Sequence, residues 1–407
     1  MSPEPHFLHA RPTRRTGGRV IFLLLGGLAL LAGLDGALIL LGLPAPVITA
    51  RLADVHGPLM VFGFVGTVVV LERAVAVRRN WAFLSPIFLG LGGIALVSPL
   101  PLAVGQVALV AGSVAMLAIY RAIWTRQPST SAAIQALGAF LGLAATILWW
   151  GGVPVPQLIP AMTLFLVLTI AGERLELARI SPTVDERAER WLLAVALALT
   201  SGVVIALLWP TVGYPVLGLA LLGLVTWLMR HDVATRLVRS SGLPRYMALC
   251  LLAGYGWLVV VGVVWILQGP AYIGPAYDAA VHAVFLGFVI SMIMAHAPTI
   301  LPAVLRRPLP YRPVMYGPVI LLHASLLVRV IGGDARGIDV LVQWGGLTNI
   351  VAVLLFVGVS VTSVLMGVPS KPGKLPAATT PAIATPPAPT APPSTATPTK
   401  ISLGTRR

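Results

Sequence analysis

Twelve apolar stretches, each long enough for a membrane-spanning helix, dominate the sequence. A hydrocarbon core about 30 Å thick needs about 20 consecutive apolar residues, because a helix rises about 1.5 Å per residue. The sequence therefore predicts an all-α polytopic membrane protein with twelve transmembrane helices. The stretches lie approximately at 20–43, 54–77, 82–99, 101–120, 131–151, 155–178, 191–209, 211–229, 246–268, 276–300, 314–333 and 339–366.

Composition excludes several other classes of protein. Hydrophobic residues make up 57% of the chain and charged residues 10%, which no soluble domain with such repeated apolar runs would carry. The net charge of +15 comes from small basic clusters at the ends of apolar stretches, so we expect membrane lipid and not nucleic acid as the partner. The single cysteine, Cys250, excludes a disulfide framework and a multi-cysteine iron–sulfur site.

The distribution of basic residues predicts the orientation. When loops alternate between two sides, only Arg51, Arg329 and Arg336 fall on one side, and the other 25 of the 28 Lys and Arg residues fall on the opposite side. The positive-inside rule then predicts a prokaryotic cytoplasmic (inner) membrane with both termini cytoplasmic. We expect a cytoplasmic leader at 1–19, a transmembrane domain at 20–366 and a disordered Pro/Thr/Ala-rich cytoplasmic tail at 367–407.

Three of the stretches share a pattern that suggests an internal repeat. Gly63 precedes Glu72 by nine residues in the second stretch, and Gly287 precedes His296 by nine in the tenth. The sixth stretch ends in Glu173-Arg174, much as the second ends in Glu72-Arg73. This predicts three arcs of four helices. The alternative is coincidence, because Gly, Val and Phe are common in membrane helices.

Four of the seven histidines, His56, His282, His296 and His323, lie inside or at the mouth of apolar stretches. An imidazole in hydrocarbon is costly, and a polar group retained there indicates function. His56 and His282 fall in the outer third of the membrane at similar depth, which is the arrangement that a six-coordinate haem needs. Nearby glycines would leave room for a macrocycle or for close helix packing: Gly57, Gly63, Gly66 and Gly287. Alternatively, each histidine bonds a neighbouring helix or interfacial water.

His296 and His323 form a second, deeper pair of candidates. His296 lies fourteen residues beyond His282, so both side chains leave similar faces of one helix. His323 lies near the middle of the membrane on the following helix, so we predict a second metal or haem site, with copper or a second haem. Against it, two histidines without a clear third ligand make a poor metal site.

Charged residues surround these candidates. Asp35 lies within an apolar stretch, and we expect Arg329 to pair with it or with a haem propionate. An intramembrane carboxylate can pair with arginine, orient a ligating histidine or relay protons, and for Asp278, at the mouth of the tenth stretch, a solvated position at the interface is the alternative. We interpret the remaining charges at inner helix ends as snorkelling groups and interfacial ion pairs: Glu72, Arg73, Glu173, Arg174 and Glu176. His231 is grouped with Asp232 in a cytoplasmic loop.

The segment His56-Gly57-Pro58-Leu59-Met60 resembles the second helix of haem–copper oxidase subunit I. The resemblance implies twelve helices in three arcs of four, with a low-spin haem between the second and tenth helices, at His56 and His282. The copper ligands of those oxidases are absent, because no histidine occurs between His56 and His231. We therefore expect no oxygen reduction of the oxidase type.

The segment from His282 to Val330 is similar to the NnrS family of bacterial membrane proteins, and it closes in Leu327-Val328-Arg329-Val330. That resemblance implies haem and copper and an association with nitric oxide metabolism. The family's usual His-Thr-Gly-Arg stands here as His-Ala-Pro-Thr from His296, and the signature of the second helix also differs. Ligand roles are therefore carried over to His56, His282, His296 and His323 alone.

We expect a protein that holds haem b through His56 and His282 and transfers electrons from a donor not yet identified or handles a small diatomic such as nitric oxide. Whether it is an enzyme stays open. A secondary transporter using Asp35 and His323 is an alternative, although no Gly/Pro-interrupted spans stand in matching halves. A haem-free membrane scaffold is another.

Overall fold

A computed structural model describes residues 19–179 and 184–367. Within these residues twelve helices are long and apolar enough to cross a membrane, and there is no β-strand. The predicted all-α fold is confirmed, and the chain is a multi-pass membrane protein. The predicted leader and tail lie outside the described residues, apart from Arg19 and Gly367 at their edges.

Several spans consist of more than one element. α2 and α3 are joined through a π-helical segment, as are α12 and α13. The elements are α1 (Val20–Leu40), α2 (Ala50–Pro58), α3 (Thr67–Val77), α4 (Leu84–Val97), α5 (Leu102–Arg126), α6 (Thr130–Trp150), α7 (Val155–Ala178), α8 (Glu186–Leu208), α9 (Pro210–His231), α10 (Ala234–Leu237), α11 (Gly242–Gln268), α12 (Gly274–His282), α13 (Ser291–Leu305), α14 (Tyr316–Leu327) and α15 (Asp339–Met366).

The predicted spans agree with the structure in number and approximate place, but several helices continue past the apolar stretch. α5 runs six residues further, to Arg126, and α8 begins five residues earlier, at Glu186. Hydropathy reports contact with lipid, whereas a helix continues through polar residues as long as its backbone hydrogen bonds are made.

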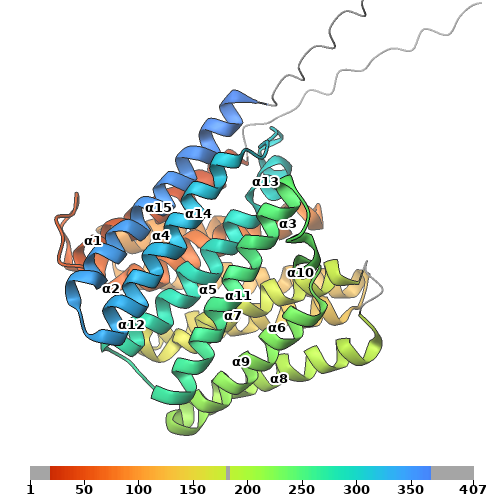
Figure 1. The fold of residues 1–407 in the computed structure, drawn as a ribbon, viewed down its shortest axis with the longest axis horizontal. Coiled ribbons are helices and arrows are strands. Elements are labelled where there is room, and N and C mark those ends of the chain that lie inside the picture. The colour runs from red at the N-terminus through yellow and green to blue at the C-terminus, as the bar shows by residue number, and fades with distance from the viewer. Residues whose placement is uncertain (1–18, 180–183, 368–407) are drawn as a thin grey trace, which may run out of the picture. The chain divides into compact units, whose positions relative to one another are not determined.

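The spans pack as three successive groups of four. In each group the first span contacts the third: α1 with α4, α6 with α8 and α11 with α14. The fourth span of each group packs against the first of the next, at the α5–α6, α9–α11 and α15–α1 seams (Figure 1). This is the predicted arrangement of arcs.

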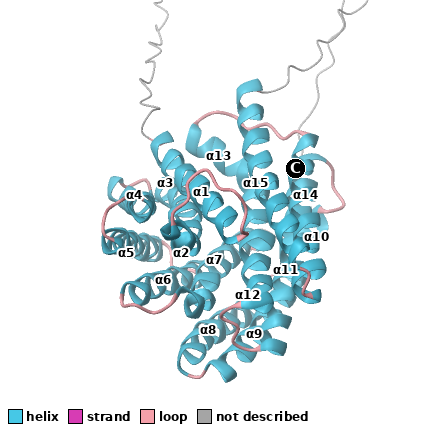
Figure 2. Cartoon of the chain, turned by 90° about the vertical axis from the view of Figure 1, so that its left-hand side faces the viewer, coloured by secondary structure: helices cyan, strands magenta, loops and turns pink. Residues whose placement is uncertain are grey.

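The second span of each group lies inside the bundle, where the three meet. α3 contacts α13, α7 contacts the π-helical segment Ala283–Ile290, and the Phe62 and Phe165 rings stack at 5.7 Å. In the most apolar 18-residue stretch of α7, 83% of the residues are buried, whereas the corresponding share is 33% for α1 and for α15. Figure 2 shows α7 among the other helices, with α4 to α6 on one side and α11 and α14 on the other. Polar groups on these three spans therefore face protein more than lipid.

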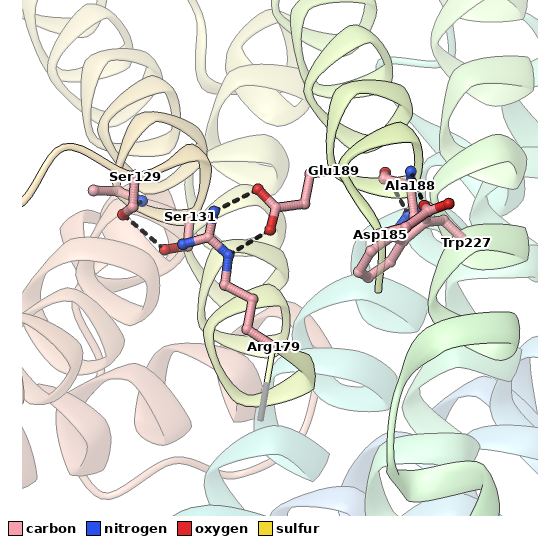
Figure 3. A network of polar contacts seen from close by, with 8 residues as sticks. Ser129, Ser131, Arg179, Asp185, Ala188, Glu189 and Trp227 are labelled. Carbon is pink, nitrogen blue, oxygen red and sulfur yellow. Dashed lines mark hydrogen bonds and ion pairs between the residues drawn. The ribbon is translucent and has the colours of Figure 1, made fainter. Parts of the chain in front are cut away.

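Two faces of the bundle are distinguished by the ends of the helices. We call the face where α1 begins and α15 ends the terminal face, and the opposite one the distal face. At the terminal face Ser129 caps α6 by accepting from the Ala132 N–H, and Asp185 caps α8 through the Ala188 N–H (Figure 3). Such caps satisfy backbone donors that a helix start leaves free.

Three spans contain π-helical segments, at Leu59–Gly66, Ala283–Ile290 and Val328–Gly333. In the described part of the chain these segments occur only in the second, tenth and eleventh spans. π-helical turns are rare and are found frequently at functional sites. These spans carry His56, His282 and Arg329.

Candidate functional site

His56 and His282 lie at comparable depth below the distal face. His56 is the seventh residue of its span and His282 the ninth of its own, which places them about 9 and 12 Å from the first residues of their helices. A π-helical segment follows each one within three residues. His56 and His282 lie on two of the three central spans, the second and the tenth.

Both imidazoles are held through the same ring nitrogen. Nδ1 of His56 lies 2.8 Å from the carbonyl oxygen of Gly33, and Nδ1 of His282 lies 2.9 Å from that of Asp278. A carbonyl oxygen only accepts, so each Nδ1 carries the proton and donates it. In the neutral ring Nε2 then has the lone pair, and neither Nε2 has a hydrogen-bond partner among the described residues. Ligating histidines are usually fixed in this way.

An ion pair between Asp278 and Arg329 lies next to His282. Arg329 Nε and Nη2 donate to the two carboxylate oxygens of Asp278 at 2.8 and 2.7 Å, and Asp278 Oδ1 lies 3.2 Å from Nδ1 of His282. A bidentate pair of this kind fixes geometry as well as charge. Asp278 therefore orients His282, and Arg329 compensates the negative charge of Asp278. We call His56, His282, Asp278 and Arg329 the distal cluster.

One expectation about these charges is wrong. Arg329 pairs with Asp278 and not with Asp35, whose carboxylate accepts the backbone N–H of Val47 at 3.1 Å. The side chain of Asp278 is 25% exposed and is held by Arg329 of the neighbouring span. Residues 278 and 329 are 51 positions apart, and the sequence does not show which sides of their helices face each other.

The glycines near the histidines serve helix packing where their surroundings are clear. A Cβ on Gly63 would lie 3.1 Å from the Cα of Gly93, so this span crosses α4 with backbone against backbone. Gly287 packs directly against the Trp257 side chain, and a Cβ added to Gly287 would clash with it. Of the two roles expected for these glycines, the structure shows close packing at Gly63 and Gly287.

A second polar cluster joins the three inner spans near the terminal face. Arg73 pairs with Glu173, which ties α3 to α7. Arg174 pairs with Asp232 at 2.9 Å and donates from Nη1 to Nε2 of His296 at 3.1 Å, which ties α7 to the end of α9 and to α13. We call Arg73, Glu173, Arg174, Asp232 and His296 the terminal cluster.

The terminal cluster is more deeply buried than the sequence indicated. The predicted ion pairs are present, but the side chain of Arg174 is only 4% exposed and that of Asp232 is fully buried, so neither snorkels to an interface. Asp232 also accepts a hydrogen bond of 2.7 Å from the Tyr255 hydroxyl. The sequence predicts a loop at Asp232 because this residue follows the last apolar residues of α9, and no feature of the sequence marks Tyr255.

The deeper histidines, His296 and His323, have separate and complete sets of partners. His296 donates from Nδ1 to the carbonyl of Met292 while Nε2 accepts from Arg174. His323 accepts from Trp257 Nε1 at 3.0 Å, so its Nε2–H donates to Ser291 Oγ at 3.2 Å. Neither imidazole has a free lone pair, so nothing in this geometry supports a shared metal or haem site.

A comparison with known families places the whole bundle in one domain. Residues 19–365 match a family described as a domain of unknown function (DUF8744). The chain belongs to this family. The DUF8744 match includes both clusters and all twelve spans except the last residue of α15. No curated protein and no solved structure matches the chain.

This DUF8744 chain offers two ring nitrogens for ligation. In residues 19–179 and 184–367, no group of three or more His, Cys, Asp or Glu side chains is placed to hold a metal ion. The pair His56 and His282 needs no third protein ligand if the partner is a macrocyclic metal complex, which supplies its own equatorial nitrogens. Their donor set fits a haem better than a bare ion.

Proposed function

We propose that this protein is a haem-binding membrane protein in which His56 and His282 are the axial ligands of a haem b. The observation that carries the proposal is the shared state of the two imidazoles. Each donates from Nδ1 to a backbone carbonyl and keeps Nε2 without a protein partner. Fixing Nδ1–H both orients a ligating ring and raises its basicity.

Electron transfer is the role that this pair favours. A haem would supply an iron that changes between two oxidation states, and His56 and His282 would hold it through their Nε2 atoms. Two histidine ligands would favour electron transfer over binding of a diatomic molecule. The handling of nitric oxide, with the NnrS-like relationship, is the second candidate. It rests on the resemblance of the segment from His282 to Val330.

Asp278 and Arg329 would support His282 as a ligand. The carboxylate lies against the Nδ1–H of His282, and its charge is compensated by the bidentate contact with Arg329. A buried carboxylate without this arginine would be strongly disfavoured in hydrocarbon. The Asp278–Arg329 pair therefore holds His282 in place without leaving an uncompensated charge between the helices.

Optical spectroscopy tests the proposal. The protein, expressed with haem supply and purified in detergent, should show split α and β haem bands in reduced-minus-oxidised spectra. His56→Ala and His282→Ala should each lose these bands, while His231→Ala and His323→Ala should retain them. A folded wild-type preparation without haem and metal would overturn the proposal and favour a transporter or scaffold.

We also propose that the membrane is a prokaryotic cytoplasmic membrane and that the terminal face is cytoplasmic. The support is the excess of basic residues on that side. The native Cys250 is buried, so it should not react with a membrane-impermeant maleimide. In right-side-out vesicles Ile273→Cys should be labelled and Arg239→Cys should not. The reverse pattern would contradict this orientation.

A further inference from the structure

The three seams between the groups of helices are not alike. α5 packs along α6 and α9 packs along α11. α15 and α1 meet near the distal face, where Gln343 donates to the carbonyl of Leu41 and Gly346 lies against the Leu41 side chain. Toward the terminal face the two helices leave a cavity of about 580 Å³ between them. We call it the seam cavity.

The seam cavity has apolar walls and a polar patch on its inner side. The walls include Leu28 of α1 and Val357 of α15, and both helices expose further apolar side chains beside the opening. The inner side is formed by the central spans, which contribute Glu72, Glu173 and His296. Besides these, the lining has two hydroxyl groups, of Thr169 on α7 and Ser360 on α15, so a molecule entering from the lipid would meet its titratable groups only at the inner end.

Of the three titratable groups, Glu72, Glu173 and His296, Glu72 is the one without an assigned role. Glu173 is paired with Arg73, and both nitrogens of His296 are used by Met292 and Arg174. Glu72 has no hydrogen bond and no ion pair with any other residue that the structure describes, although Glu173 and Arg73 influence it electrostatically. A carboxyl group in a membrane helix without a protein partner indicates a ligand or a proton pathway.

The chemistry of this patch selects the charge of the ligand. Phosphate or carboxylate head groups would be repelled by Glu72 and Glu173 in a medium of low dielectric constant. An uncharged head with hydroxyl groups would donate to the Glu72 carboxylate, and a protonated Glu72 would donate to a ring carbonyl. The apolar walls suit a long hydrocarbon chain, and the volume is typical of small-molecule sites.

We propose that the seam cavity binds a membrane-dissolved quinol or quinone, with its ring near Glu72 and its chain along the α1–α15 seam. Both oxidation states of such a molecule offer groups that Glu72 can bond. The choice of a quinol over another hydroxyl-bearing lipid rests on the proposed haem, which needs an electron donor. Glu72 lies sixteen residues beyond His56, about 24 Å along the helix, so the two sites are separate.

Two substitutions test binding at the seam cavity. Glu72→Gln removes the charged acceptor and should weaken binding about tenfold, as expected for loss of a charge-assisted hydrogen bond. Gly27 lines the cavity, and a Cβ there has no atom within 4 Å, so Gly27→Leu should fill the cavity without disturbing the fold. Gly358→Leu is the matched control, because Gly358 is equally open on α15 but lies outside the lining.

The measurement is equilibrium binding of decylubiquinol, kept reduced, and of decylubiquinone to the purified full-length protein in detergent. Dioleoylglycerol and phosphatidylglycerol serve as comparison ligands. We expect saturable binding of the quinol and quinone that Gly27→Leu and Glu72→Gln weaken and Gly358→Leu leaves unchanged. Equal binding of either comparison lipid, or unchanged binding in both cavity variants, would overturn the proposal.

Binding and haem content are read separately. Quinol binding that depends on Glu72 in a haem-free preparation would support the cavity and refute the proposed haem function. Haem bands with no quinol binding would do the opposite. Haem content should be unchanged in Gly27→Leu, because the distal cluster lies at the other end of the central spans.

Discussion

The distal and terminal clusters place the same residue type at opposite ends of the same central spans, and they use it differently. In the distal cluster each histidine is held through Nδ1 and leaves Nε2 without a protein partner. In the terminal cluster Nε2 of His296 accepts a hydrogen bond from Arg174, so the ring is complete within the protein. One arrangement leaves two ring nitrogens available, and the other joins helices.

The charges divide in the same way. Arg329 and Asp278 compensate each other beside His282, and the pair joins only the tenth and eleventh spans, which follow one another in the chain. Arg174 and Asp232 link α7 to the end of α9, with Tyr255 of α11 as a third partner. The three histidines are all partly buried, so burial does not separate the two clusters, and the partner of the second ring nitrogen does.

The largest effect is expected from breaking the terminal cluster. Arg174→Met leaves the carboxylate of Asp232 buried without its cation, which should lower the free energy of unfolding by about 3 to 5 kcal/mol. Denaturant unfolding in detergent micelles measures this loss. The double variant Arg174→Met/Asp232→Leu should recover part of it, because no isolated charge remains. A single variant as stable as the wild type would refute the structural role.

The distal cluster should respond in ligand affinity. Asp278→Asn weakens the hold on Nδ1 of His282 and the pairing with Arg329, and the expected loss of haem affinity is on the order of 10- to 100-fold. Titration of haem into the apoprotein measures it. The control is Arg336→Met, another arginine of the distal face that is exposed. Equal affinity in Asp278→Asn and wild type would remove Asp278 from the site.

The number of spans follows from the sequence because every crossing needs about 20 apolar residues and every turn interrupts them. The shared depth of His56 and His282 follows as well, since depth is residue count multiplied by 1.5 Å. The partner of Arg329 does not follow. Hydropathy does not show which way a helix faces about its own axis. Asp35 and Asp278 both lie at a depth close to that of Arg329, so depth alone does not select its partner.

Asp232 shows a second reason why a site residue escapes prediction. It ends an apolar stretch beside Arg230 and His231, which is the usual composition of a loop. In the folded chain α10 and α11 fold back over it, and Arg174 and Tyr255 reach it from other spans. A break in hydropathy marks where contact with lipid ends. Whether the residues beyond it are buried in protein or exposed to water is decided by tertiary packing.

His323 tests whether a histidine with complete partners can be removed without affecting ligands. His323→Phe loses the hydrogen bonds with Trp257 and Ser291, each worth about 1 kcal/mol, so stability should fall by about 1 to 2 kcal/mol. Haem and copper contents, measured by optical spectroscopy and metal analysis, should equal those of the wild type. Loss of either cofactor in a folded His323→Phe protein would return this residue to the list of ligands.

The smallest effect is expected at an ion pair on the surface of the terminal face. Arg179, which follows α7, donates from Nε to Glu189 of α8 at 2.6 Å, and its Nη2 contacts the other carboxylate oxygen (Figure 3). This hydrogen bonding to Glu189 raises the pKa of Arg179 above its ordinary value. The side chains are 35% and 20% exposed, so solvent screens the pair.

Arg179→Met should therefore lower the free energy of unfolding by less than about 1 kcal/mol, and the difference should shrink further in high salt. The same denaturant unfolding assay applies. Arg174→Met is the direct contrast, since both arginines belong to the end of one helix and differ in burial. Similar losses in the two variants would mean that burial does not separate the terminal cluster from the surface, and that the three central spans are held together mainly by apolar packing.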